Sequence, residues 1–471
     1  MKDPKAHVAI IGGGITGLSA AFYLFQQIRK KNLPLTFTLI EANKRLGGKI
    51  QTVRQDGFVI ERGPDSFLAR KQSAAELVKE VGLESELVRN ETGQAYILQQ
   101  DQLIPIPEGA VMGIPTKFKP FAASPLFSPM GKIRAAMDLI LPRIQSEEDE
   151  PIGRFFRRRL GNEAVDRLIE PLLSGVYAGD LDRLSLLSTF PNFRDLEKRE
   201  RSLILGMKKT RPPQPKNVKK PPGAFLTLKR GLQSLVEAIE TQLPAESIVK
   251  ETTVKELEKT ETGYRLFLNN GETIQAHTVI LTVPHPVAYN ILARYSFLKP
   301  LDPLPPTTVA TVALAYSAEV HLRLDGTGFL VPRENTDYTI TACTWTHRKW
   351  PHTTPPGKSL LRCYVGRAGD ESIIDESDEV ILETVQRDLK RSMNIEATPS
   401  FTYITRWRQS MPQYIVGHLD RLKNTREQLQ RHLPGVFLAG ASYEGIGLPD
   451  CIKQGKEAAD KVLQQITEKA L

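Results

Sequence analysis

The chain has 471 residues and carries 63 basic against 54 acidic side chains, a net charge of +9. At roughly 100–200 residues per domain, this length predicts two to four domains. The composition is 40% hydrophobic, 25% charged and 7% aromatic, which excludes a disordered, collagen-like or coiled-coil chain. The positive charge favours anionic partners in general terms, without identifying the anion.

Cysteines, histidines and apolar runs narrow the class further. The three cysteines (Cys343, Cys363 and Cys451) are too few and too far apart for a disulfide framework or a zinc motif, and they favour a reducing compartment. The eight histidines lack metal-ligand spacing. The longest apolar runs, 279–283 and 309–315, have strand length and fall short of the ~18 residues of a spanning helix. We therefore expect a cytoplasmic protein without a bound metal.

The N-terminal region has the pattern of a β-α-β unit. Residues His7–Ile11 and Thr36–Ile40 are typical of buried strands, and Gly17–Gln27 is typical of the helix between them. This order predicts two parallel strands joined by a right-handed crossover.

The next segments are predicted to be mainly helical. Ser73 and Glu76 have the spacing of a capping box, and Gly82 is a suitable end for the helix that they open. Residues 92–205 are predicted to form a mostly helical insertion. The stretch 198–230 is strongly basic, and its proline-rich middle predicts a loop. That loop is either a solvated linker or a patch for acidic lipids or acidic partners.

The second half of the chain is predicted to be rich in strands. Asn269-Asn270-Gly271 predicts a tight hairpin turn. The expected strands are 253–257, 264–268, 273–276, 279–283, 307–316, 328–331, 338–346, 359–367, 400–405 and 435–438, and the expected helices are 231–242, 377–393 and 449–466.

The first glycine cluster carries the strongest functional signal. Gly12-Gly13-Gly14-Ile15-Thr16-Gly17 fits the G-x-G-x-x-G motif between a strand and a helix. The start of such a helix offers free N–H groups to phosphates. Glu41 ends the second strand 24 residues after Gly17, where a carboxylate binds the two hydroxyls of an adenosine ribose. Together these residues predict a dinucleotide-binding site.

Two further segments favour a flavin over a nicotinamide. Arg45-Leu46-Gly47-Gly48-Lys49 provides a second close approach of backbone to a pyrophosphate, and Gly63-Pro64-Asp65-Ser66 forms a tight loop suited to the edge of a flavin ring. Near the C-terminus, Gly445–Pro449 leads into a helix whose N–H groups can face the flavin carbonyl edge, where reduction places negative charge.

These motifs resemble those of the FAD-dependent amine-oxidase superfamily, within which the whole chain resembles the porphyrinogen oxidases of the soluble, Gram-positive type. Leu173–Asp180 is the segment most specific to that branch. The resemblance implies an α/β (α+β) fold, with a Rossmann-like FAD-binding domain of the GR2 type, a β-rich substrate domain and a helical insertion. The implied domains are FAD-binding (1–72, 223–290 and 406–471), substrate (73–91 and 291–405), helical insertion (92–205) and basic loop (206–222).

The resemblance also implies the site residues. Non-covalent FAD phosphates would lie on Gly12–Gly17, the ribose on Glu41, and Ala42 and Lys49 nearby. The ring would lie against Gly63, Pro64, Asp65 and Ser66, and the adenine would meet the backbone of Val254. The closing residues would be Trp407, Ile446, Gly447 and Leu448. In the substrate cavity, Gly175 would orient the substrate and Lys71 would bind a propionate, because Ser174 stands where eukaryotic members have arginine.

The implied reaction is the six-electron oxidation of coproporphyrinogen III in haem biosynthesis, with protoporphyrinogen IX as a second substrate hypothesis. It proceeds in three two-electron cycles with molecular oxygen as acceptor and hydrogen peroxide as product. No nucleic acid is expected as a partner. Peripheral contact with an anionic membrane and hand-off of product to a downstream haem-pathway enzyme are the partner hypotheses.

Two other functions fit parts of the pattern. One is another oxidase or desaturase of the superfamily, although Lys71 and the basic charge disfavour an amine substrate. The other is a flavin-free binding protein like the Rab GDP-dissociation inhibitors, against which the intact Glu41 and Gly47-Gly48 argue.

Overall fold

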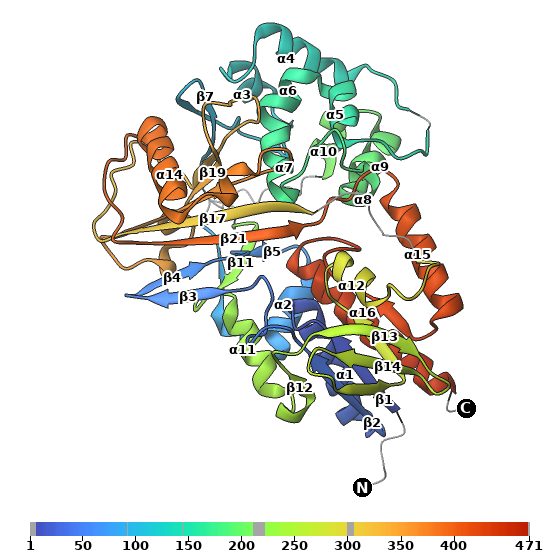
Figure 1. Cartoon of the computed structure of the whole chain (residues 1–471). Helices are drawn as coiled ribbons and strands as arrows, with labels where there is room; N and C mark the ends of the chain where they lie inside the picture. The colour runs from blue at the N-terminus through green and yellow to red at the C-terminus, as the bar shows by residue number, and fades with distance from the viewer. Residues whose placement is uncertain (1–5, 92, 145, 211–221, 299–305, 470–471) are drawn as a thin grey trace.

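A computed structural model describes the chain except residues 1–5, 92, 145, 211–221, 299–305 and 470–471. Figure 1 shows a parallel sheet with its helices near both chain termini, a long antiparallel sheet across the middle, and a group of helices at the far end. Each of the two sheets combines segments that are distant in the sequence.

The first sheet has five parallel strands in the order β12–β2–β1–β16–β22. Ile10 of the central strand is paired with Leu39 on one side and Ile280 on the other. Because both faces are covered, the strands are almost continuously apolar. The predicted parallel pair is confirmed. The strands are β1 (Ala6–Ile11), β2 (Leu35–Ile40), β12 (Ile248–Val249), β16 (Thr278–Leu281) and β22 (Val436–Leu438).

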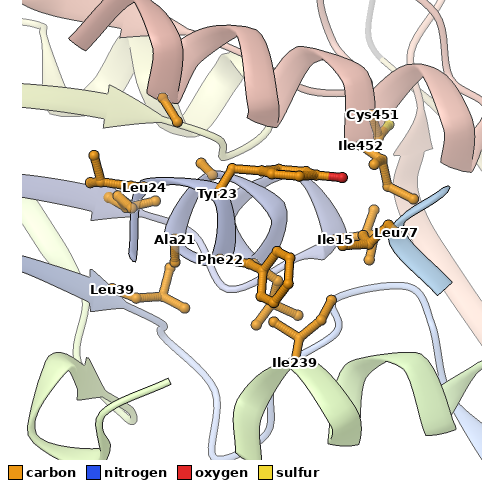
Figure 2. Packing of buried hydrophobic residues seen from close by; sticks show 14 of the residues in the cluster. Ile15, Ala21, Phe22, Tyr23, Leu24, Leu39, Leu77, Ile239, Cys451 and Ile452 are labelled. Carbon is orange, nitrogen blue, oxygen red and sulfur yellow. The ribbon is translucent and has the colours of Figure 1, made fainter. Parts of the chain in front are cut away.

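Helix α1 (Ile15–Lys31) contacts the long C-terminal helix α16 (Leu448–Lys469). A Cβ atom at Gly455 of α16 would lie 2.3 Å from the carbonyl oxygen of Thr16, so the two backbones are in direct contact. Figure 2 shows Phe22 of α1 beside Ile239 of α11 (Gln233–Gln242) in the same apolar core. Helix α1 is longer than predicted and ends at Asn32, which has a left-handed φ of 48°.

A three-stranded antiparallel sheet, β13–β14–β15, shares a core with the other face of the parallel sheet. Its strands are β13 (Val254–Lys259), β14 (Tyr264–Leu268) and β15 (Thr273–Ala276). The predicted hairpin turn is confirmed, and Gly271 supplies the positive φ of 85° that the turn requires.

The large sheet has seven strands in the order β21–β17–β20–β19–β18–β7–β8. Helix α14 (Asp378–Met393) packs its apolar face on this sheet. The strands are β7 (Ala95–Gln99), β8 (Gln102–Pro105), β17 (Thr307–Tyr316), β18 (Gly328–Leu330), β19 (Ile340–Trp345), β20 (Ser359–Val365) and β21 (Phe401–Met411).

Two predicted boundaries near this sheet are wrong. The helical insertion was predicted to begin at residue 92, but β7 and β8 come first and join the large sheet through parallel pairing of β7 with β18. Strands β7 and β8 pair with each other as a local hairpin, and the distant strand β18 attaches that hairpin to the sheet. The strand predicted to stop at 405 continues to Met411, because β17 offers it a partner along that length.

The helices at the far end form their own apolar core. They are α3 (Phe118–Ala123), α4 (Pro129–Ala136), η2 (Met137–Leu139), α5 (Ile152–Leu160), α6 (Asn162–Ala164), the π-helix η3 (Val165–Ile169), α7 (Glu170–Tyr177), α8 (Leu186–Thr189), α9 (Pro191–Glu200) and α10 (Leu203–Thr210). The predicted basic loop 206–222 therefore starts too early, because residues 206–210 are helical. Residues 211–221 of that loop lie outside the described residues.

The remaining elements connect the parallel sheet, the large sheet and the helices at the far end. The capping box predicted at Ser73 is wrong. Lys71 is the N-cap residue of α2, without a side-chain bond, and the Ser73 hydroxyl donates to the carbonyl of Pro449 at 2.6 Å. Gly82 does follow the helix, with a φ of 84°. The elements are β3 (Thr52–Gln55), β4 (Phe58–Glu61), β5 (Phe67–Leu68), α2 (Gln72–Glu80), η1 (Glu84–Glu86), β6 (Leu87–Arg89), β9 (Ala110–Val111), β10 (Ile114–Pro115), β11 (Phe225–Leu228), η4 (Ala245–Ser247), α12 (His285–Ile291), α13 (Thr346–Lys349), η5 (Pro351–Thr353), η6 (Ser372–Asp375) and α15 (His418–His432).

Candidate active site

One large cavity runs from the glycine loop after β1 to the end of α7 and strand β20. Its volume is about 2210 Å³, whereas a site for one small ligand has about 300–1,000 Å³. The cavity therefore has room for a dinucleotide and a second large ligand together. All of the predicted site residues except Gly13 and Gly17 line it.

The first glycine loop forms a cradle for an anion. Gly12 has a φ of 107°, and a Cβ atom at Gly17 would lie 1.9 Å from the carbonyl oxygen of Gly12. A Cβ atom at Gly14, by contrast, would have no protein atom within 4 Å. Gly14 is also the N-cap residue of α1, and as a glycine it has no side chain that could cap the helix. The first N–H groups of α1, at Ile15 and Thr16, are therefore available to a phosphate.

The second glycine pair lies directly against the first loop. The amide of Gly47 donates to the carbonyl of Gly13 at 2.8 Å, and a Cβ atom at Gly48 would lie 3.2 Å from Cα of Gly14. Lys49 follows, lines the cavity and donates from Nζ to the carbonyl of Ser410. Burial lowers the pKa of this lysine. The close contact, together with a φ of 57°, favours glycine at position 48.

Glu41 holds the glycine loop in place. Its Oε2 accepts a hydrogen bond from the amide of Gly13 at 2.7 Å, and its Oε1 accepts from the backbone and side chain of Asn43 at 2.8 and 2.6 Å. A carboxylate has about four lone-pair positions, so capacity remains for ligand hydroxyls. Ala42 lines the cavity next to it. The loop-holding role was not predicted from the sequence.

Val254 lies at the start of β13, close to the end of β2. Thr252, two residues earlier, donates its amide to the carbonyl of Glu41 at 3.0 Å. Val254 is buried and lines the cavity. The structure therefore brings Val254 and Glu41 together across more than 200 residues of sequence, as the resemblance implied.

The loop Gly63–Ser66 is held by cations. A Cβ atom at Gly63 would lie 1.9 Å from the carbonyl oxygen of Lys49, and the Gly63 carbonyl accepts a hydrogen bond from Arg362. Asp65 accepts from Ser66 at 2.6 Å and pairs with Lys349 at 3.0 Å. Burial raises the pKa of Asp65, but Lys349 and Arg362 outweigh that effect and hold it below its usual range. Asp65 is therefore ionised at neutral pH.

Trp407 and the first turn of α16 close the same part of the cavity. The indole N–H of Trp407 donates to the carbonyl of Arg62 at 2.9 Å, which fixes the ring beside the Gly63 loop. Ile446, Gly447 and Leu448 line the cavity where α16 begins. The N-terminus of α16 therefore meets the cavity, as the sequence predicted.

The structure uses Lys71 differently from the prediction. Its Nζ lies 2.6 Å from Oδ2 of Asp450, on the first turn of α16, and this ion pair joins α2 to α16. An incoming anion would have to share the ammonium with that carboxylate.

Gly175 is helical and does not form a sharp turn. It lies in the last turn of α7, where a Cβ atom would have no neighbour within 4 Å. The left-handed residue is Ala178, with a φ of 49°. In the last turn of a helix the carbonyls have no N–H partner further along the helix. The Gly175 carbonyl therefore remains a candidate acceptor for a substrate N–H group.

Sequence reasoning missed three residues that organise the site. Arg362 is the only charged residue in the otherwise apolar strand β20, and that isolation was a usable signal. Nothing in the sequence around Lys349 or Thr282 marks either of them as a site residue. The Thr282 hydroxyl lies within 2.9 and 2.8 Å of the carbonyl oxygens of Ile11 and Gly12 and fixes the strand-to-loop turn.

Within the described residues, no cluster of three or more His, Cys, Asp or Glu side chains has the arrangement of a metal site. The three cysteines are buried and unbridged. The same residues contain no helix with the length and apolar character needed to cross a bilayer.

Comparison with known protein families decides the assignment of this geometry. The profile described as flavin containing amine oxidoreductase matches residues 15–463. The chain belongs to the flavin-containing amine oxidoreductase family. The resemblance drawn from the sequence motifs is confirmed, and the alternative of a flavin-free binding protein is set aside.

Relatives within the family are similar over the full chain. The chain is 56% identical over 467 residues to a coproporphyrinogen III oxidase of Bacillus subtilis, covering 98% of this chain and 99% of that protein. It is 43% identical to a coproporphyrinogen III oxidase of Staphylococcus aureus, with 98% and 99% coverage. It is 30% identical to the protoporphyrinogen oxidase of Homo sapiens, with 97% and 98% coverage.

Solved structures support the same fold. A crystal structure from Exiguobacterium sp. 255-15, provisionally assigned as a protoporphyrinogen oxidase, is 40% identical with a TM-score of 0.89, covering 98% of this chain and 99% of that chain. A reduced UDP-galactopyranose mutase, 16% identical with a TM-score of 0.72 and 98% and 96% coverage, shares the fold alone. The predicted α/β fold with a flavin-binding β-α-β unit is confirmed.

Proposed function

We propose that this chain oxidises coproporphyrinogen III to coproporphyrin III with molecular oxygen as acceptor, in haem biosynthesis. The observation that carries the proposal is the 56% identity to a coproporphyrinogen III oxidase over nearly the whole of both chains. The cavity volume of about 2210 Å³ supports it, because a tetrapyrrole and FAD must be held together. Three oxygen molecules accept the six electrons and leave as three hydrogen peroxide molecules.

FAD would extend along the N-terminal part of the cavity. The N–H groups at the start of α1 would receive the pyrophosphate, Glu41 the ribose and the strand start at Val254 the adenine. The loop at Gly63–Ser66, Trp407 and the first turn of α16 would enclose the ring. This placement is supported by the open space at Gly14, which a side chain would fill. When bound, the flavin supplies a two-electron acceptor that oxygen re-oxidises.

The protein's own contribution would be positioning and exclusion of water. The substrate end of the cavity is lined by apolar side chains, including Val176, Leu330 and Val331. Such a lining holds the four pyrrole rings of a porphyrinogen and keeps bulk water from them. The free carbonyls in the last turn of α7 would orient a pyrrole N–H group. This reaction does not require a strong general base among the residues that line the cavity.

The direct test is anaerobic mixing of the flavin-loaded protein with each porphyrinogen while flavin absorbance is recorded. We expect coproporphyrinogen III to bleach the flavin rapidly, and oxygen to restore the absorbance with release of hydrogen peroxide. Polyamines and phytoene serve as negative controls for the other activities of the superfamily. Bleaching by polyamines or phytoene without bleaching by a porphyrinogen would refute the proposal.

The surface of the helical part fits a peripheral contact with an anionic membrane. Phe118, Met130, Ile133 and Ile140 lie within one short segment and are 75%, 73%, 61% and 71% exposed. Large exposed apolar groups gathered in this way are typical of interaction sites. Lys117, Lys119 and Lys132 lie beside them in the sequence. In Figure 1 this segment, α3 and α4, lies at the end opposite the chain termini.

Vesicle co-sedimentation tests this contact. We expect the protein to bind vesicles that contain phosphatidylglycerol more strongly than neutral vesicles. A Phe118→Ser change should weaken binding roughly tenfold, because burying such a side chain contributes about 1.5–3 kcal/mol. Val380→Ser, at an exposed apolar side chain on α14, is the matched control. Equal binding of all three proteins, or no binding, would contradict a membrane-facing role for this segment.

A further inference from the structure

Two arginines lie close together near the substrate end of the cavity, and one of them, Arg367, lines it. Arg367 follows β20, is only 9% exposed and lines the cavity. Arg333 lies in the loop after β18 and donates from Nη1 to the carbonyl of Ala368 at 2.8 Å, so the two loops are tied together. The amide of Ala368 in turn donates to the carbonyl of Ala178 at the end of α7. The arginine pair is therefore adjacent to the segment that contains Gly175.

The carboxylates near this pair do not satisfy it. Asp370 lies 3.5 Å from Nε of Arg367, and its own side chain is 54% exposed. Glu170 lies 3.5 Å from Nε of Arg333. Strong ion pairs of this type have N···O distances of about 2.7–2.9 Å. Nε of both arginines and Nη2 of Arg333 are buried and have no hydrogen-bond partner among the described residues.

Burial of such donors is unfavourable unless a ligand completes them. A buried donor without a partner costs roughly 1–3 kcal/mol, and more for a charged group. Burial, and then the charge of Arg333, lower the pKa of Arg367. An anion in the cavity beside Arg367 would offset the repulsion between the two positive charges. Two other cations that line the cavity are already paired, with Lys71 at 2.6 Å from Asp450 and Lys349 at 3.0 Å from Asp65.

We propose that Arg367, supported by Arg333, binds a propionate of the substrate at a position where protoporphyrinogen IX carries a vinyl group. The proposal rests on the function proposed above. Coproporphyrinogen III has a propionate on each of its four rings, whereas protoporphyrinogen IX has two propionates and two vinyl groups. A vinyl group beside Arg367 leaves the guanidinium unpaired, so this arginine favours the tetracarboxylate. Arg367 is thus a specificity-determining residue at the substrate end of the cavity.

The test compares Arg367→Met, Arg367→Lys and the control Arg387→Met, whose guanidinium is 65% exposed on α14. KM and kcat are measured with both porphyrinogens, and the dissociation constants of coproporphyrin III and protoporphyrin IX are measured by fluorescence titration. We expect Arg367→Met to raise KM for coproporphyrinogen III about 10- to 100-fold, as loss of a charged hydrogen bond predicts, with little change in kcat. Arg367→Lys should recover part of the affinity, and Arg387→Met should match the wild type.

The two substrates decide the interpretation. A clearly smaller change with protoporphyrinogen IX than with coproporphyrinogen III supports the specificity role. Equal losses for both substrates, or no loss for either, overturn it. Thermal unfolding and flavin content identify a variant that misfolds, and Arg367→Lys, which keeps the charge, then decides by its preference between the two porphyrins. If the wild type oxidises neither porphyrinogen, the proposed function fails, while the porphyrin titrations still decide the role of Arg367.

Discussion

A Gly14→Ala variant should fold normally and bind FAD about 10- to 100-fold more weakly, as expected for loss of one charge-assisted hydrogen bond. Gly14 has a φ of −69° and a ψ of 177°, which alanine adopts without strain. Its Cβ would have no protein atom within 4 Å and would occupy the space in front of the first N–H groups of α1. The methyl group would thus displace the pyrophosphate and not the protein. FAD titration of the apoprotein, followed by flavin fluorescence, measures the effect.

Gly17→Ala is the matched control on the same loop. Its Cβ would lie 1.9 Å from the carbonyl oxygen of Gly12 and 2.7 Å from Oγ1 of Thr282. The backbone would have to move, so this variant should lower the melting temperature of the apoprotein, which Gly14→Ala should leave unchanged. A Gly14→Ala protein with full FAD affinity would show that the pyrophosphate lies elsewhere.

Arg159→Met should lower the free energy of unfolding by roughly 3–5 kcal/mol, the typical cost of removing one partner from a buried ion pair. Arg159 and Asp138 are fully buried in the helical part, and their closest N···O distance is 2.6 Å. Nη1 of Arg159 also donates to the carbonyl of Pro142 at 2.9 Å. Without the guanidinium, the carboxylate of Asp138 loses its counter-charge inside the protein. Urea denaturation followed by circular dichroism measures the loss.

Two further variants separate the loss of a buried ion pair from the loss of a positive charge in general. Arg265→Met removes an exposed guanidinium 3.5 Å from Glu258, and it should change stability by about 0–1 kcal/mol, as exposed pairs do. The double variant Arg159→Met/Asp138→Leu replaces both charges with apolar groups and should recover part of the loss. The recovery is incomplete because the Ser202 hydroxyl and the Ile204 amide lose their acceptor at Asp138. If Arg159→Met proves as stable as Arg265→Met, the buried pair does not stabilise the helical part.

The accuracy of the sequence-based predictions follows the range of the interactions involved. The β-α-β unit and the hairpin at 269–271 were correct, because apolar periodicity and glycine at positive φ act within a few residues. The errors lie where a distant partner decides the outcome. The hairpin of β7 and β8 joins the large sheet through β18, more than 200 residues later, and β21 is extended by its pairing with β17. The Ser73 hydroxyl bonds to Pro449, and not within its own helix.

The candidate site divides in the same way. The sequence by itself determined the tight glycine turn at residues 12–17 and the carboxylate at Glu41 that follows it, because a tight turn between strand and helix admits few residue types. Only the tertiary structure decided the charges around the cavity. Lys71 is paired with Asp450, 379 residues away, whereas the carboxylates nearest to Arg333 and Arg367 lie at 3.5 Å. Electrostatic energies depend on distance and burial in space, and spacing along the chain carries neither.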